Sequence, residues 1–259
     1  LDLINNFSNL DRYKFLKIDL SNIEDTKEAI KLSNPDIVFH LAAESHVDRS
    51  ISAPRNFLES NVIGTFNLLE ALMPHWEFIP SARKTNFRLI HVSTDEVFGS
   101  LGRLGHFSEE SPYSPNSPYS ATKAASDHIV KAWHKTFGLP TIVTNSSNNF
   151  GAWQLPEKLI PLVIVNALSN KPFPIYGDGK NIRDWIYVED HVDALLKVAL
   201  NGRVGDSYCI GGSQEKSNNE IVELICKILD NYKKSNAPHS KFKYYVEDRL
   251  GHDKRYSID

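Results

Sequence analysis

The chain has 259 residues, 41% of them hydrophobic and 24% charged, and its 29 basic and 32 acidic residues give a formal charge of −3. This balance excludes a disordered chain, and the lack of a basic excess argues against a nucleic-acid-binding protein. The longest apolar stretches are far shorter than the roughly 20 residues that span a bilayer, so no membrane partner is expected. The two cysteines, Cys209 and Cys226, favour a reducing, cytoplasmic compartment.

The first part of the chain alternates short β-branched runs with amphipathic helical stretches. In chain order, the pattern predicts a strand at 15–19, a helix at 24–32 capped by Asn22 or Ser21, a strand at 37–41, a helix at 56–73, a strand at 88–92, a helix at 120–137 and a strand at 141–145. Such alternation is typical of an α/β fold, and we predict a Rossmann-like, doubly wound parallel sheet.

After about residue 150 this alternation lapses, and Pro, Trp and Gly become frequent. We therefore expect a Rossmann-like domain over 1–150 and a smaller α/β substrate-binding lobe over 151–259, which is interleaved with the first domain. A predicted helix at 188–200 and a strand at 207–210 would return about residues 186–210 to the main sheet.

Both ends of the sequence lack features that a complete domain of this kind would have. The chain starts at Leu1 rather than Met, has no glycine before Gly64, and stops after a loop at Asp259. A doubly wound dinucleotide-binding sheet normally carries a glycine-rich turn after its first strand. We therefore expect a fragment that is truncated at both ends, with each predicted domain incomplete.

Tyr119 and Lys123 are four residues apart on a predicted helix, so they share one face of it. A nearby ammonium stabilises a phenolate, which would let Tyr119 act as a base near neutral pH. Alone, this pair also fits a solvated helix face. It gains weight from Ser93 and Thr94, which end an apolar strand, because open α/β sheets bind ligands at the carboxyl ends of their strands.

Asp95 and Glu96 follow Thr94 directly and place two carboxylates at the same predicted edge of the sheet. Adjacent acids on a loop are usually just solvated. Beside a candidate base they suggest a second acid and base, which simple hydride transfer or 4-epimerisation does not need. Elimination of water does need them, since one group removes a proton and another protonates the departing hydroxyl.

A strand-end Ser/Thr followed by Tyr-x-x-x-Lys resembles the short-chain dehydrogenase/reductase superfamily. Within it, the chain resembles the dTDP-glucose 4,6-dehydratase family, an extended branch that acts on a nucleotide sugar. The departures are the missing glycine turn, a missing C-terminal helical end, and Ala152 and Leu250 where proline is common. The matching stretches are 41–50, 93–99, 119–123, 147–151, 156–161, 182–191 and 247–253.

The resemblance implies NAD as cofactor, dTDP-glucose as substrate, a homodimer and no metal. Tyr119 would deprotonate the glucose 4-hydroxyl, with Lys123 tuning it and holding the nicotinamide ribose, and Thr94 would hydrogen-bond the same hydroxyl. Hydride would leave C4 for NAD, Glu96 would take the C5 proton, and Asp95 would protonate the departing C6 hydroxyl. Return of the hydride to C6 would give dTDP-4-dehydro-6-deoxy-glucose.

The same resemblance implies two sets of binding residues. Those for the cofactor are Asp19, Leu20, Leu41, Ala42, Ala43, Ser45, Ser60, Tyr119, Lys123 and Asn149. Those for the substrate are Ser45, Thr94, Asn148, Lys158, Leu159, Pro174, Tyr176, Arg183, Asn218, Asp248, Arg249 and His252.

Arg183 and Arg249 suit a diphosphate, because a guanidinium binds phosphate oxygens in pairs. An isolated arginine is more often a surface charge or part of a salt bridge. Arg183 is the stronger candidate, since it sits between apolar residues in Ile-Arg-Asp-Trp. His252 has a simpler alternative, in which it only caps a loop.

Two other readings stay open. One is another extended-family nucleotide-sugar enzyme, such as a different dehydratase, a 4-epimerase or a decarboxylase; Asp95 and Glu96 disfavour the last two. The other is a non-catalytic fragment that binds a sugar nucleotide. Retention of the tyrosine, the lysine and both carboxylates speaks against a decayed site.

Overall fold

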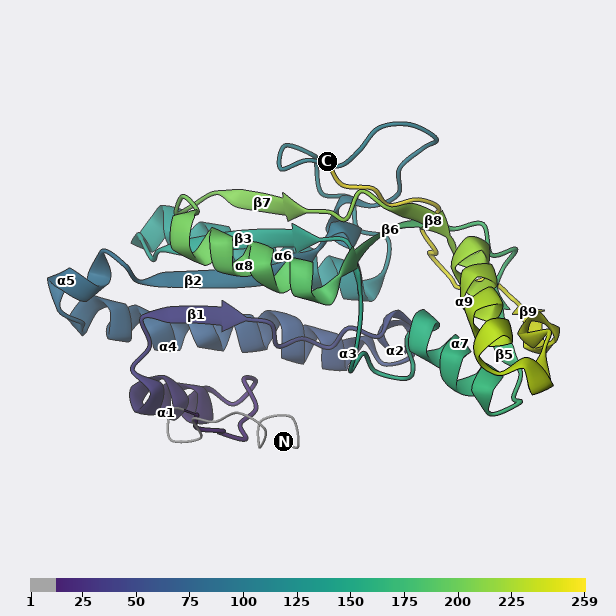
Figure 1. The fold of residues 1–259 in the computed structure, drawn as a ribbon. Coiled ribbons are helices and arrows are strands. Elements are labelled where there is room, and N and C mark those ends of the chain that lie inside the picture. The colour runs from purple at the N-terminus through teal and green to yellow at the C-terminus, as the bar shows by residue number, and fades with distance from the viewer. Residues whose placement is uncertain (1–12) are drawn as a thin grey trace.

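The computed structural model describes residues 13–259, and its centre is a four-stranded parallel sheet (Figure 1). All neighbouring pairs run parallel, as the predicted α/β fold requires. No helix within the described residues is long and apolar enough to cross a membrane. The strands lie in the order β1 (Ile37–His40), β2 (Arg88–Thr94), β3 (Thr141–Ser146) and β7 (Ser207–Ile210).

Helices cover both faces of this sheet. Successive residues of each strand point to opposite sides, so each strand contributes apolar side chains to both faces. Leu89 of β2 and Val143 of β3 share an apolar cluster with α4 and α6. Their neighbours Ile90 and Ile142 pack in a second cluster with α8. The doubly wound arrangement is thus confirmed. The helices concerned are α4 (Gly64–Phe78), α6 (Pro118–Phe137) and α8 (Val188–Asn201).

The helix predicted at 120–137 begins two residues earlier, because Ser117 forms a capping box with Ser120. It ends where Gly138 adopts a left-handed conformation, with φ of 76°. The first predicted helix is α1 (Ile23–Ser33), and its cap is Asn22, whose side chain accepts from two backbone N–H groups of the first turn.

The helix predicted at 56–73 is longer and is interrupted. It consists of α3 (Pro54–Phe57), the π-helical segment η3 (Leu58–Ile63) and α4. The wider π-helical turn carries Asn61, which is buried and exchanges two hydrogen bonds with the backbone of Glu44. Its amide also donates to the Thr122 hydroxyl at 3.0 Å. Short segments nearby are α2 (Val47–Ser52), α5 (Ser81–Lys84) and the 3-10 turn η4 (Asp95–Phe98).

The strand predicted at 15–19 is wrong. Residues 13–19 have no regular structure, and no strand of the described chain pairs with them. Apolar residues alone do not make a strand, since its backbone groups need a hydrogen-bonded neighbour. The segment instead leads into a turn, in which Asp19 accepts from the backbone of Ser21, and the Leu20 carbonyl accepts from Asn67 of α4.

A second group of elements lies beyond the carboxyl ends of the main strands, at the right of Figure 1. Its apolar core joins α7 and α9 to β5 and β6. β7 and α8 do return to the main sheet, while a division of the chain near residue 150 stays a prediction. The elements are β4 (Asn148–Phe150), β6 (Ile182–Tyr187) and β8 (Glu215–Ser217) in one sheet, β5 (Phe173–Tyr176) paired with β9 (Lys243–Val246), α7 (Leu159–Leu168), α9 (Asn218–Tyr232), η5 (Lys234–Asn236) and η6 (His239–Phe242).

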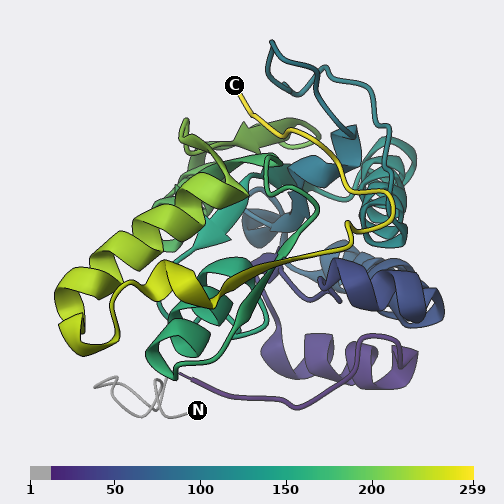
Figure 2. The same ribbon diagram turned by 90° about the vertical axis from the view of Figure 1, so that its right-hand side faces the viewer.

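The last residues run back from β9 toward the main sheet, as the yellow segment of Figure 2 shows. Arg255 forms a β-bridge with Ile182 of β6, and Ile258 forms one with Phe107. Arg255 also makes a paired salt bridge with Glu215 of β8. This C-terminal segment therefore ties the second group of elements to the loop that follows β2.

Candidate active site

The predicted catalytic residues meet where β2 ends and α6 begins. Thr94 is the last residue of β2, and its hydroxyl accepts from the Glu96 backbone N–H at 3.2 Å and donates to the Asp95 carboxyl at 3.3 Å. Tyr119 lies in the first turn of α6, close enough to Thr94 for that hydroxyl to lower its pKa. Strand end and helix start thus bring Thr94, Asp95, Glu96, Tyr119 and Lys123 together, although their roles stay predictions.

Asp95 is buried and Glu96 is half-buried, and this changes the acidity of both carboxyls. Burial and the neighbouring Glu96 charge raise the pKa of Asp95 well above its usual value. Burial also raises the pKa of Glu96, while the charges of Arg183 and Arg249 oppose the rise. One oxygen of Asp95 is buried without a hydrogen-bond partner in the described structure. These conditions favour a protonated Asp95, as a general acid requires.

Tyr119 and Lys123 are both buried. Burial, and then the Glu96 charge, raise the pKa of Tyr119, whereas its hydrogen bond with Thr94 lowers it. The Lys123 ammonium donates to the Val92 carbonyl at 2.9 Å, and burial lowers its pKa. Thr94, rather than Lys123, is therefore the group seen to favour the Tyr119 phenolate, and tuning by Lys123 stays a prediction.

A buried carboxylate that the sequence reasoning missed lies beneath this cluster. Asp127 is fully buried and accepts hydrogen bonds from Ser93 and Tyr113 at 2.9 Å and from Asn145 at 3.2 Å. The His91 ring nitrogen lies 3.1 Å from its other oxygen. Burial opposes ionisation, but the His91 hydrogen bond and charge prevail and lower the pKa of Asp127. A sequence signal existed, since Tyr119, Lys123 and Asp127 follow one another at helical spacing of four.

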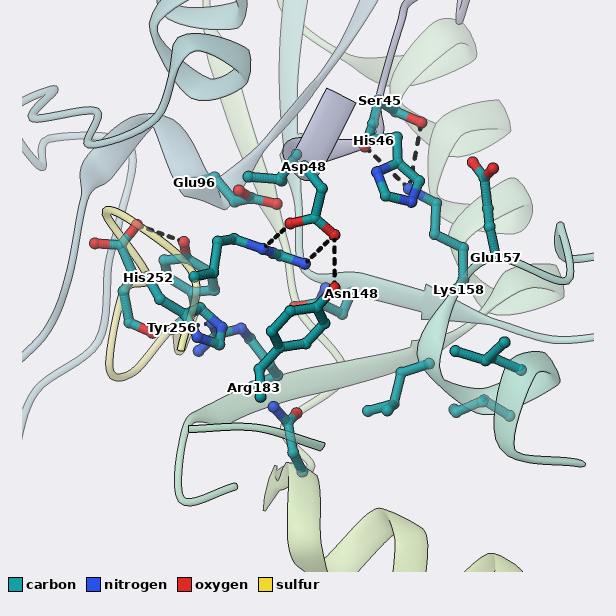
Figure 3. A pocket seen from close by; sticks show the side chains of 18 of the residues that line it. Ser45, His46, Asp48, Glu96, Asn148, Glu157, Lys158, Arg183, His252 and Tyr256 are labelled. Atoms are coloured by element: carbon teal, nitrogen blue, oxygen red, sulfur yellow. Dashed lines mark hydrogen bonds and ion pairs between the residues drawn. The ribbon is translucent and has the colours of Figure 1, made fainter. Parts of the chain in front are cut away.

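A cleft of about 450 Å³ opens from Glu96 toward the second group of elements (Figure 3). Asp48, Trp185, Asp253 and Tyr256 also line it and were not predicted. Three of them, Asp48, Trp185 and Asp253, lie in stretches that carried the family resemblance. The predicted substrate residues that line the cleft are Ser45, Asn148, Lys158, Leu159, Pro174, Tyr176, Arg183, Asn218, Arg249 and His252.

Two predicted substrate residues do not line the cleft. Thr94 lies in the buried cluster described above. Asp248 instead holds His252, whose ring nitrogen lies 2.6 Å from the Asp248 carboxylate. His252 therefore has the loop contact that the alternative predicted, but it also lines the cleft. Burial lowers the pKa of His252, so its neutral form is favoured.

Three cationic side chains face the cleft, each with a different partner. Arg249 is paired with Asp48 at 2.5 Å, and Lys158 donates to the Ser45 carbonyl at 2.9 Å. Arg183 is buried, lies 4.2 Å from the Tyr256 ring centroid and donates to the Asp253 carbonyl. None of the ion pairs within residues 13–259 includes Arg183. Its charge is therefore available to an anionic ligand.

Some residues predicted to bind the cofactor lie exposed at the carboxyl edge of the sheet. Leu41, Ala42 and Ala43 are exposed where β1 ends, beside the carboxyl end of β2. This exposed apolar run and the buried Lys123 fit the nicotinamide end of a dinucleotide. The sequence contains no G-x-G-x-x-G that would hold the diphosphate.

The other cofactor candidates have structural contacts of their own. Ser45 accepts from Lys158 through its carbonyl, and Asn149 bonds the His191 ring at 2.9 Å. Ser60 lies in the π-helical segment η3. Asp19 and Leu20 form the turn before α1. Their contact with a cofactor stays a prediction.

Comparison with known proteins gives one consistent result. The family model described as GDP-mannose 4,6 dehydratase matches residues 2–259. The dTDP-glucose 4,6-dehydratase of Haemophilus influenzae is 51% identical over 256 residues, which are 97% of this chain and 76% of the relative. The solved dTDP-glucose 4,6-dehydratase of Bacillus anthracis, in complex with NAD, is 44% identical with a TM-score of 0.80, covering 99% of this chain and 75% of that one.

The fold alone does not separate reaction types. A Thermus thermophilus UDP-glucose 4-epimerase, solved in complex with NAD, has a TM-score of 0.81 at only 25% identity, covering 93% of this chain and 75% of that one. The higher identity to dehydratases favours a dehydratase over the 4-epimerase alternative. The chain belongs to the dTDP-glucose 4,6-dehydratase family of NAD-dependent hydro-lyases.

Proposed function

We propose that this protein converts dTDP-glucose to dTDP-4-dehydro-6-deoxy-glucose, with Tyr119, Thr94, Glu96 and Asp95 moving the protons. The observation that supports this most is that a buried phenol and a buried carboxyl lie beside Glu96, whose carboxyl lines a cleft with three cationic side chains. A nucleotide sugar has a diphosphate for the cations and a hexose for the cluster.

NAD, held by Lys123 and the residues at the end of β1, would supply a hydride acceptor for C4 that later serves as the donor for C6. Tyr119 takes the proton of the 4-hydroxyl, to which Thr94 also hydrogen-bonds. The resulting 4-ketone acidifies the C5 proton, and Glu96 removes it. Asp95 protonates the C6 hydroxyl, which departs as water. Each group needs a particular protonation state. Burial favours the protonated Asp95 that an acid requires. The charges of Arg183 and Arg249 favour the ionised Glu96 against the effect of its burial.

The substrate would lie along the cleft with its diphosphate near Arg183, Arg249 and Lys158. A guanidinium that lacks a carboxylate partner binds phosphate without first losing an ion pair, which favours Arg183 over Arg249. The remaining lining residues would contact the sugar and the nucleoside.

The direct test uses the complete gene product with dTDP-glucose and no added reductant. We expect a 4-keto-6-deoxy product, identified by its mass, which is one water lower than that of the substrate. UDP-galactose should not be converted to UDP-glucose. Epimerisation without a 4-keto product would contradict the proposal.

The cofactor is tested separately with the 259-residue chain alone. Because its sequence holds no glycine-rich turn to bind the diphosphate, we expect weak NAD binding in calorimetry. If the chain instead binds NAD with a micromolar dissociation constant, the residues at the carboxyl edge of the sheet are sufficient to bind the cofactor without a glycine-rich turn.

We also propose a cytoplasmic homodimer. Phe78 and Phe137, near the ends of α4 and α6, are 86% and 51% exposed, and such aromatic side chains are typical of subunit contacts. Trp133 of α6, by contrast, packs inside against Phe66. Sedimentation of the complete gene product tests the dimer, and a monomer at micromolar concentration would contradict it.

A further inference from the structure

The cleft contains a carboxylate that the proposed reaction does not use. Asp48 lies in the first turn of α2 and lines the cleft, in which a nucleotide sugar would place its negatively charged diphosphate. A carboxylate in this position repels such a ligand. Both of its oxygens contact the Arg249 guanidinium, which donates from Nε at 2.5 Å and from Nη2 at 3.3 Å. Asp48 therefore engages one of the cations that the diphosphate would need.

Arg249 differs in this respect from the other two cations of the cleft. Within the described residues, Lys158 and Arg183 have no carboxylate partner and donate to backbone carbonyls instead. A neutral carbonyl offers one uncharged oxygen, whereas a carboxylate presents a pair of charged oxygens to a guanidinium, as a phosphate does. Asp48 is thus a direct competitor of a diphosphate for Arg249.

Tyr176, the last residue of β5, holds both members of this pair. Its hydroxyl donates to Asp48 Oδ2 at 3.1 Å, and its ring centroid lies 5.1 Å from the Arg249 guanidinium. Dashed lines mark the contacts of Asp48 in Figure 3. The side chains of Asp48 and Arg249 are 34% and 22% exposed, so a ligand can reach the pair. If Arg249 turns to a ligand, Asp48 keeps the tyrosine hydroxyl and is open to water, and no unpaired buried charge results.

We propose that Asp48 competes with the substrate diphosphate for Arg249 and thereby limits how tightly the cleft holds its ligand. The inference rests on the proposed function, in which substrate and product carry the same diphosphate and differ only in the hexose. Without a competitor, Arg249 would hold both equally, and such uniform binding does not accelerate the chemistry. By reclaiming the guanidinium, Asp48 speeds the departure of the product. It is a positioning residue, which acts through Arg249 and not on the reacting atoms.

The test measures the dissociation constant of dTDP, which supplies the diphosphate without a hexose, by calorimetry of the complete gene product. Asp48→Asn keeps the shape and an acceptor for Tyr176 but removes the charge. We expect the dissociation constant to fall about three- to tenfold, as when a half-buried ion pair no longer competes. Asp48→Ser, which also removes the charge, should give the same gain. In a rapid chase, bound dTDP should leave both variants more slowly than wild type.

Glu157→Gln is the matched control for the lost charge. Glu157 also lines the cleft, and its side chain is 25% exposed, but its partner Arg49 does not line the cleft. This substitution removes one negative charge without releasing a cleft cation, so the dissociation constant should change by less than about twofold. An equal gain in Glu157→Gln would mean that the net charge of the cleft, and not the pair, sets the affinity, and the competition would be refuted.

Arg249→Gln separates competition from simple repulsion. If Asp48 acts through Arg249, Asp48→Asn should not improve dTDP binding in the Arg249→Gln background, because no guanidinium is left to release. A gain that persists there contradicts the inference, as does unchanged or weaker binding by Asp48→Asn, or a gain with no change in the rate of release. Absence of dTDP binding by wild type would overturn the diphosphate site together with the competition. Binding of dTDP without any 4-keto product from dTDP-glucose would instead overturn the proposed reaction alone.

Discussion

At the carboxyl end of β2, Thr94, Asp95 and Tyr119 are buried, whereas two cations of the cleft, Arg249 and Lys158, are only half-buried. Thr94 donates to Asp95 inside the protein, beside the buried Tyr119. Arg249 is held by Asp48 and the Tyr176 ring, and Lys158 by Ser45, and a ligand can replace these contacts. The first arrangement suits groups that must keep a defined geometry and acidity, and the second suits groups that must accept and release a substrate.

This contrast predicts which kinetic constant each region controls. A change in the buried cluster alters groups that act on the transition state, so kcat should fall. A change among the cleft cations removes contacts to a diphosphate that does not react, so KM should rise. The experiments below test this division.

The largest expected effects come from the buried cluster, in the complete gene product. Tyr119→Phe should lower kcat by about 10²–10⁴-fold, the usual cost of losing a general base, and no exchange of the C5 proton with deuterated water should occur. Asp95→Asn should lower kcat comparably but keep C5 exchange, because Glu96 still acts. Glu96→Gln should abolish the exchange. If Asp95→Asn lost the exchange and Glu96→Gln kept it, the roles of the two carboxyls would be reversed.

The next effect concerns stability and the carboxylate beneath the cluster. Asp127→Asn should lower the free energy of unfolding by about 3 kcal/mol, as expected when one partner of a buried charged network is removed. Three hydrogen-bond donors and His91 converge on this carboxylate, and an amide cannot accept from all of them. Urea denaturation measures the change. Asp193→Asn, the same substitution at an exposed position of α8, is the control and should change the free energy by less than about 0.5 kcal/mol.

The cleft should respond through KM. Arg183→Gln should raise KM for dTDP-glucose about 10- to 100-fold, since a hydrogen bond to a charged group contributes about 1.5–3 kcal/mol. Arg249→Gln should raise it less, because the Asp48 ion pair already engages that guanidinium. Steady-state kinetics of both variants decide the ranking. A larger KM effect at Arg249 would make it the principal phosphate ligand and would show that the Asp48 pair opens on binding.

Arg183→Gln has a second, distinguishable consequence. The Arg183 charge lowers the pKa of Glu96 against the effect of burial. Loss of this charge should therefore move the acidic limb of the kcat–pH profile to higher pH. An unshifted limb would mean that Arg183 acts on the substrate alone.

The elements that the sequence predicted well are those with strong local signals. The helix at Tyr119 has a capping residue, an apolar face and a terminal glycine, and the strand that ends at Thr94 contains the apolar residues Leu89, Ile90 and Val92. Because a parallel sheet gathers the carboxyl ends of its strands at one edge, the catalytic cluster could be predicted from these two elements alone.

The parts that the sequence did not predict depend on partners distant in the chain. An apolar run near residue 17 has a strand-like composition, but no described strand lies beside it. Asp127 is one more acid on a helix until His91, Tyr113 and Asn145 converge on it. The C-terminal segment runs back toward the main sheet and pairs Arg255 with Glu215. A hydrophobic pattern along the sequence does not predict such a pair.

The smallest expected effect is on the pH dependence of the free energy of unfolding, and it tests whether the buried His40 stays neutral in the folded protein. His40 is buried, bonds Thr65 at 2.9 Å and lies beside the His91 ring. Burial, then the charges of His91 and Lys123, lower the pKa of His40 well below its usual value.

Because the folded pKa of His40 lies below the unfolded value of about 6.5, the unfolded chain binds the extra proton first as the pH falls. Wild type should therefore lose stability between pH 7 and pH 5 relative to His40→Gln, which cannot titrate, by at most about 1.4 kcal/mol for each pH unit. Urea denaturation of both proteins at pH 7, 6 and 5 measures this difference. Buried carboxyls such as Asp95 and Glu96 titrate in both proteins and cancel. A difference that stays constant with pH would mean that His40 has the same pKa in the folded and unfolded chain, and that the environment beneath the cluster is more polar than its burial indicates.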